Sequence, residues 1–129
     1  EVINKMKHRI TLTLPSIQIH AELNSTRTAK LIWEALPIES HVNLWGKEIY
    51  FQIPVYESVE DGKSVVEAGT LAYWPPGNAL CIFYGPTPAS TGEEIRPSSP
   101  VAIIGQVLGN LNTLSKVKSN SVVKIESHI

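Results

Sequence analysis

The sequence predicts a mainly β protein whose short strands form an antiparallel barrel. Three observations predict this class. Two segments near the amino terminus alternate apolar and polar residues, six further short runs are rich in strand-forming residues, and one segment alone has the pattern of a long helix. Because turn-forming residues separate the runs, we expect neighbouring strands to be antiparallel and the sheet to close on itself.

The two alternating segments are residues 9–14 and 16–23. In the first, Ile10, Leu12 and Leu14 share one face, and threonines occupy the other. The second repeats the pattern and places Gln18, His20 and Glu22 on its outward face, opposite Ile17, Ile19, Ala21 and Leu23. Alternation of this kind predicts two half-buried antiparallel strands, and the proline between them suits a tight connection.

A helix is predicted next. Asn24 or Ser25 supplies its amino-terminal cap, and Pro37 ends it after Leu36. Leu31, Ile32, Ala35 and Leu36 form its apolar stripe, and we expect the helix to cover one mouth of the barrel. A short helical turn is predicted near residues 111–117. The remaining strand-like runs are residues 42–45, 48–55, 70–74, 79–84, 101–107 and 121–129.

A hairpin turn is predicted between Trp74 and Asn78. Proline presets φ at one central position of such a turn, and Gly77 is expected to supply a positive φ at the next. The run that follows, residues 79–84, is apolar at every position, so it predicts a strand buried on both faces with Cys81 inside it.

Composition fits a single domain over residues 1–129, in which residues 1–8 form an amino-terminal extension. The chain is 43% hydrophobic and 18% charged, which suffices for a core without disulfides or metals. A net charge of −1 without a basic stripe argues against a nucleic-acid partner. The lone cysteine favours a reducing, cytoplasmic location, and no apolar run is long enough to span a membrane.

Few residues carry recognisable chemistry. The sequence contains no nucleophile elbow, no phosphate-binding glycine loop and no metal-ligand spacing, and its four histidines are widely separated. We therefore assign no catalytic residue, metal or cofactor. The two long irregular segments, residues 56–69 and 85–100, are expected to be ordered loops near the functional site.

The strand beginning at Glu48 is the best candidate site. Glu48, Tyr50 and Gln52 share a face, so a carboxylate, a phenol and an amide would line a polar groove; a solvated strand face is the alternative. Phe83 is a candidate ring for this groove, with core packing as its alternative, and the same choice applies to Trp45, Tyr73 and Trp74. Arg96, in a proline-framed loop, is a candidate anchor for a carboxylate or a carbonyl, or else a surface charge.

Several stretches resemble a known family. They are VNLWGKEIYF at 42–51, YWPPGNALCIFYG at 73–85, Thr87-Pro88, and IIGQVLG at 103–109 before a short helix and a final strand. Over about residues 9–129 the chain is similar to small prokaryotic cyclophilin-like proteins. This resemblance implies a closed eight-stranded antiparallel barrel with one long and one short capping helix, and a groove along one outer face.

The resemblance does not extend to the catalytic residues of cyclophilins, in which a groove-strand arginine, flanked by histidine and phenylalanine, holds the proline amide. Residues 41–52 contain no arginine, and residues 96–101 lack the tryptophan and histidine found there in cyclophilins. We expect little or no prolyl isomerase activity, and binding of a small molecule or peptide by Glu48, Tyr50, Gln52, Phe83 and Arg96. Two alternatives stay open: a prolyl isomerase that uses Arg96, and a component of a lactam-hydrolysing or carboxylating enzyme, which would need a larger partner. The oligomeric state is left open.

Overall fold

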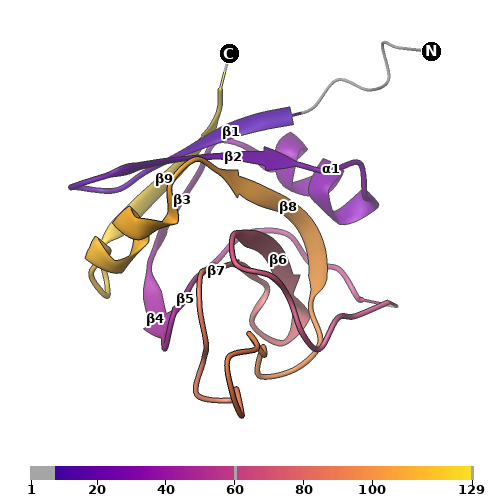
Figure 1. Ribbon diagram of the computed structural model, residues 1–129. Coiled ribbons are helices and arrows are strands. Elements are labelled where there is room, and N and C mark those ends of the chain that lie inside the picture. The colour runs from indigo at the N-terminus through magenta and orange to yellow at the C-terminus, as the bar shows by residue number, and fades with distance from the viewer. Residues whose placement is uncertain (1–7, 60, 129) are drawn as a thin grey trace.

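The structure is a computed structural model that describes residues 8–59 and 61–128. In this part of the chain, nine strands form one antiparallel sheet that curls into a nearly closed barrel (Figure 1). The strand order is β3-β9-β1-β2-β8-β6-β7-β5-β4. The elements are β1 (His8–Thr13), β2 (Gln18–Leu23), α1 (Arg27–Ala35), β3 (Ile38–His41), β4 (Asn43–Trp45), β5 (Glu48–Gln52), β6 (Thr70–Trp74), η2 (Pro75–Gly77), β7 (Ala79–Phe83), β8 (Ala102–Leu108), η3 (Leu111–Lys116) and β9 (Val122–Ser127). The mainly β antiparallel barrel predicted from the sequence is confirmed.

The amino-terminal hairpin follows the alternating pattern. β1 pairs with β2 so that Ile10 faces Ala21 and Leu12 faces Ile19, and all four side chains are buried. These residues belong to the main core inside the barrel, together with apolar residues from the other strands. The period-two pattern therefore predicted both the strands and the face that each buries. Apart from His8, which begins β1, the expected extension at residues 1–8 lies outside the described residues.

One strand was not predicted, so the barrel has nine strands where eight were expected. β3 pairs with β9, which places Ile38 opposite Ile125 and Glu39 opposite Lys124. Only Ile38 is buried in this four-residue strand, so the segment shows no alternation that could indicate a strand. β3 forms because β9, far away in sequence, provides a partner edge. Val42, buried between β3 and β4, joins the two outermost strands of the sheet.

The helix begins one or two residues later than expected, at Arg27. Thr26 is the cap, and its Oγ1 accepts a hydrogen bond from the backbone N–H of Ala29 at 3.3 Å. Asn24 supports the cap instead: its Oδ1 accepts from the Thr26 hydroxyl at 2.7 Å, and its Nδ2 donates to the carbonyl of Ile103 on β8 at 2.9 Å. A capping side chain reaches only two or three residues forward, so the later start of the helix selects Thr26.

Helix α1 and the short helical segment η3 cover the barrel interior. Ala29 and Ile32 on α1, and Leu114 on η3, belong to the same core as the inward-facing strand residues. In Figure 1, α1 lies beside β2 and β8, and the η3 segment lies on the other side of the barrel, near β9. The long helix and the short helical turn were both predicted from the sequence.

The turn between β6 and β7 differs in detail from its prediction. The residue with positive φ is Asn78, at 47°, and not Gly77. Gly77 lies in η2, where a Cβ would come within 2.7 Å of the Trp74 ring. Glycine is therefore required at this position for space, while asparagine, which tolerates the left-handed conformation better than most residues, ends the short helix.

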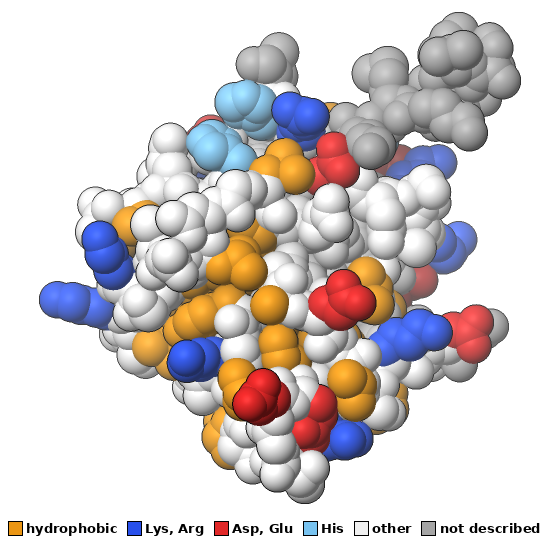
Figure 2. All heavy atoms as spheres, in the orientation of Figure 1, with side chains coloured by type: hydrophobic (Ala, Val, Ile, Leu, Met, Phe, Trp, Pro, Cys, Tyr) orange, Lys and Arg blue, Asp and Glu red, His pale blue; other side chains and the backbone are white. Residues whose placement is uncertain are grey.

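Charged side chains are dispersed on the face that Figure 2 shows. Lysine and arginine side chains lie apart from one another among acidic ones, and hydrophobic side chains reach the surface between them. None of the helices in the described residues has the length and hydropathy to cross a membrane.

Candidate functional site

A second, smaller hydrophobic cluster lies on the outer face of the barrel wall. We call it the outer cluster; it consists of Val66, Ala72, Ala79, Cys81, Phe83, Ile95 and Val101, with Tyr50 and Trp74 packed against it. Its strand residues come from β6 and β7, whose other side chains point into the main core. This explains why β7 is apolar at every position and fully buried, as predicted.

The two long loops cover this cluster. An isolated bridge joins Lys63 to Val101, with backbone hydrogen bonds of 2.7 and 3.1 Å, and a second joins Val66 to Ile95 at 3.0 Å. The buried Tyr73 ties down the start of the first loop, because its hydroxyl donates to the Val55 carbonyl at 2.6 Å. The loops expected to carry function are therefore ordered and paired with each other over one face of β6 and β7.

Glu48 is buried at the edge of the outer cluster. It is 6% exposed, and it lies opposite Phe83 on β7, with the Tyr50–Cys81 pair next along the strands. The Cys81 thiol donates a hydrogen bond to its carboxylate. Among the described residues, no salt bridge includes Glu48. The Glu48 carboxylate is therefore largely removed from water, and no cation from the described part of the chain compensates for the lost hydration.

This burial changes the acidity of both groups. Desolvation raises the pKa of Glu48 from an ordinary 4.5 to about 7, and the hydrogen bond from Cys81 opposes part of that rise. Burial also raises the pKa of the Cys81 thiol, and the neighbouring Glu48 charge raises it further. Near neutral pH the pair therefore holds a thiol and a carboxyl group that is partly protonated.

Two aromatic rings and an amide form the rim above this pair. Tyr50 and Trp74 are half-buried and meet edge to face, with ring centroids 6.3 Å apart. The indole Nε1 of Trp74 donates to Ser99 Oγ at 2.7 Å, which fixes the ring against the second loop. Gln52 follows on the same face of β5 and is exposed.

The remaining candidates have different surroundings. Phe83 is completely buried in the outer cluster, beneath the loops. Arg96 is half-buried in the covering loop, and its Nε donates to Glu94 Oε2 at 3.2 Å. Hydrogen bonds, led by the one from the backbone N–H of Thr91, lower the pKa of Glu94 to about 2. The structure thus brings Glu48, Tyr50, Gln52 and Phe83 together on β5 and β7, while Arg96 is held within its own loop.

Sequence reasoning missed the pairing of Glu48 with Cys81. The contact depends on the register between β5 and β7, which places Cys81 two positions away from the residue directly opposite Glu48. A carboxylate and a cysteine on two separate strand-like runs were the available signal, but no spacing in the chain specifies that register.

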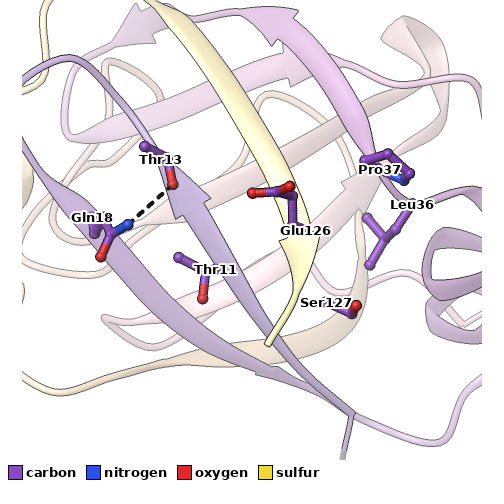
Figure 3. A pocket seen from close by; sticks show the side chains of 7 residues that line it. All are labelled: Thr11, Thr13, Gln18, Leu36, Pro37, Glu126 and Ser127. Carbon is purple, nitrogen blue, oxygen red and sulfur yellow. Dashed lines mark hydrogen bonds between the residues drawn. The ribbon is translucent and has the colours of Figure 1, made fainter. Parts of the chain in front are cut away.

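A hollow lies on another part of the barrel wall, along the outer face of β1 and β9 (Figure 3). Gln18 donates to Thr13 across its floor at 3.4 Å. None of its residues was a candidate site residue from the sequence, because most of them are outward polar residues on alternating strands, which is the ordinary pattern for a solvated face. The lining residues are Thr11, Thr13, Gln18, Leu36, Pro37, Glu126 and Ser127.

Comparison with known proteins agrees with this fold. A family model described as cyclophilin-like matches residues 8–126. The solution structure of a hypothetical protein from Archaeoglobus fulgidus is similar, with a TM-score of 0.82, 38% sequence identity and coverage of 95% of both chains. No curated protein matches closely enough to count as a relative. Because the family model spans most of the chain, and the archaeal protein shares both its sequence and its fold over nearly the full length, the chain belongs to the cyclophilin-like family.

Proposed function

We propose that the protein binds a small molecule or peptide at the outer face of β5 and β6, beside the paired loops. One observation carries the proposal: Glu48 is buried there with no salt bridge from any residue that the structure describes, and its burial raises its pKa to about 7. Burying a carboxyl group in this way costs stability, and side chains with strongly shifted pKa values cluster at functional sites.

The surrounding groups suit a ligand with an amide or a similar polar group. Tyr50 and Trp74 offer aromatic surface, and the exposed Gln52 amide both donates and accepts hydrogen bonds. Glu48 orients Tyr50 or the ligand from below, and its carboxyl group can donate a hydrogen bond when protonated and accept one when ionised. Arg96 adds a positive charge at the loop, and Phe83 supports the rings from beneath. A cytoplasmic location is part of this proposal.

Ligand binding is expected at β5 and β6 when the protein is titrated with a library of small amides and with an Ala-Ala-Pro-Phe peptide. Backbone amide NMR signals from β5 and β6 should shift with at least one probe. Saturation should raise the melting temperature, because a ligand at 100 times its Kd adds ~2.7 kcal/mol of stability. Gln52→Ala, at an exposed position, should weaken the binding without unfolding the protein.

Thr13→Ala is the matched control for Gln52→Ala, because Thr13 lies on the outer face of β1, in the hollow. It should leave binding unchanged. Shifts confined to the hollow, or no response to any probe, would show that the proposed site is wrong.

Prolyl isomerase activity is expected to be at the uncatalysed level. The peptide bond must cross a barrier of ~18–20 kcal/mol, and a donor aimed at the proline amide is needed to lower it. Arg96 is not aimed at the groove as a free side chain, since its Nε donates to Glu94 in the same loop. A protease-coupled assay with the Ala-Ala-Pro-Phe peptide measures the rate. Catalysis that disappears in Arg96→Ala but persists in Arg27→Ala, an exposed arginine on α1, would instead identify an isomerase.

A further inference from the structure

Two histidines far apart in sequence lie together on the outer face of β1. His20 is on β2 and His128 follows β9, and these two strands flank β1 on either side. Their ring centroids are 5.2 Å apart, and the ring planes meet at 67°. Both residues are exposed, and Figure 2 shows neighbouring histidine side chains at the top of the molecule.

Both rings direct the same nitrogen at one hydroxyl group. Thr11 Oγ1 is 3.2 Å from His20 Nδ1 and 3.1 Å from His128 Nδ1. A hydroxyl has a single proton, so it can donate to only one of the two nitrogens. The other Nδ1 must then carry a proton and donate to the oxygen. At most one Nδ1 lone pair therefore accepts the threonine proton, and the threonine hydroxyl is a weak and replaceable partner for both rings.

These distances match the spacing of ligands around a metal ion. Ligand atoms that each lie ~2.0–2.2 Å from a zinc ion, at tetrahedral angles, are roughly 3.3–3.6 Å apart, so the two Thr11–histidine distances need to lengthen only slightly. A ring bound through one nitrogen has its centroid roughly 3 Å from the metal, so two such rings have centroids roughly 4.5–5.5 Å apart. The separation of 5.2 Å between the His20 and His128 rings lies in that range.

We propose that His20 and His128, with the Thr11 hydroxyl between them, form a surface site for a divalent late transition-metal ion such as Zn²⁺ or Cu²⁺. Imidazole nitrogen is a preferred ligand for these ions, and affinity increases from Zn²⁺ to Cu²⁺ at a given site. Within the described residues, no three acidic, cysteine or histidine side chains converge as a metal site. Water and the Thr11 hydroxyl would therefore complete the coordination.

The neighbouring strands provide a favourable charge. Glu126 lies directly opposite Thr11 on β9 and lines the hollow beside the histidine pair. Its carboxylate is 3.6 Å from Lys124 Nζ in an exposed ion pair, which is weak in water. Glu126 can accept a hydrogen bond from a metal-bound water, a common role for an outer carboxylate at such sites.

Zinc titration of the tag-free full chain tests the site. Calorimetry should show one equivalent of Zn²⁺ bound, and ring-proton NMR signals of His20 and His128 should shift while those of His8 and His41 stay in place. Cu²⁺ should bind more tightly than Zn²⁺, with nitrogen coordination visible by electron paramagnetic resonance. His20→Gln and His128→Gln should each weaken binding by at least about tenfold, since even the loss of an outer partner costs roughly 10–100-fold.

His41→Gln is the matched control, because His41 is an exposed histidine on β3 outside the pair. It should bind Zn²⁺ like the unaltered protein, and circular dichroism should confirm that all three variants fold. Absence of saturable binding at millimolar Zn²⁺ would overturn the proposal. So would a site that survives in both His20→Gln and His128→Gln, or ring-proton shifts confined to His8 and His41.

Discussion

Phe83→Ala is expected to lower the free energy of unfolding by roughly 3–5 kcal/mol, the range for removing a fully buried phenylalanine. Phe83 is completely buried in the outer cluster, where it contacts neighbours from both the strands and the covering loops. Its removal leaves a cavity beneath loops that the bridges at Lys63–Val101 and Val66–Ile95 hold in place, so the site can collapse only in part. Urea unfolding followed by tryptophan fluorescence measures the change.

Tyr56→Ala provides the control for this experiment. Tyr56 is an aromatic residue in the first loop with 70% of its surface exposed. Its substitution should change the free energy of unfolding by no more than about 0.5 kcal/mol, as is usual at the surface. A loss below about 1 kcal/mol for Phe83→Ala would mean that the loops do not pack on the outer cluster, which would also remove the enclosed surroundings proposed for Glu48.

The change that Glu48→Gln makes to the free energy of unfolding is expected to be more stabilising at pH 8 than at pH 4. The folded protein holds the Glu48 proton up to a pKa of about 7, whereas the unfolded chain releases it near 4.5. Between these values the folded state binds more protons, so its stability falls as pH rises. The rise in the Glu48 pKa from 4.5 to about 7 corresponds to a loss of folding stability on the order of 3 kcal/mol. Glutamine cannot ionise and avoids this loss.

Urea unfolding of both proteins at several pH values between 4 and 8 gives the measurement. The stability advantage of the glutamine variant should grow between about pH 4.5 and pH 7 and then level off. Glu94→Gln should instead lower the free energy of unfolding. The lowered pKa of Glu94 stabilises the folded state above about pH 4.5, and the glutamine variant loses that contribution. If the advantage of Glu48→Gln is constant with pH, the Glu48 carboxyl is hydrated in the folded protein and does not form the proposed site.

Patterns along the chain predicted most of the barrel. Strict alternation at β1 and β2 and uniform apolarity at β7 each reflect how many faces of a strand are buried, and burial is what selects the side chains. The long helix α1 was predicted from its apolar stripe and from the proline that follows it. β3 was missed because a strand with only one buried residue depends on its pairing with β9, and pairing with a distant segment leaves no local pattern.

Local patterns likewise predicted one part of the candidate site, and the rest depends on contacts between distant segments. Period-two alternation predicted that Glu48, Tyr50 and Gln52 share one face of a strand, because side chains alternate in this way in any strand. Three further features followed only from the folded chain: Glu48 contacts the thiol of Cys81, Phe83 is buried beneath the loops, and Arg96 binds Glu94. The folded chain also decided that His20 and His128 meet over Thr11. Each of these contacts joins separate strands or depends on how a loop folds, and so follows from sheet register and loop packing, which local residue patterns do not encode.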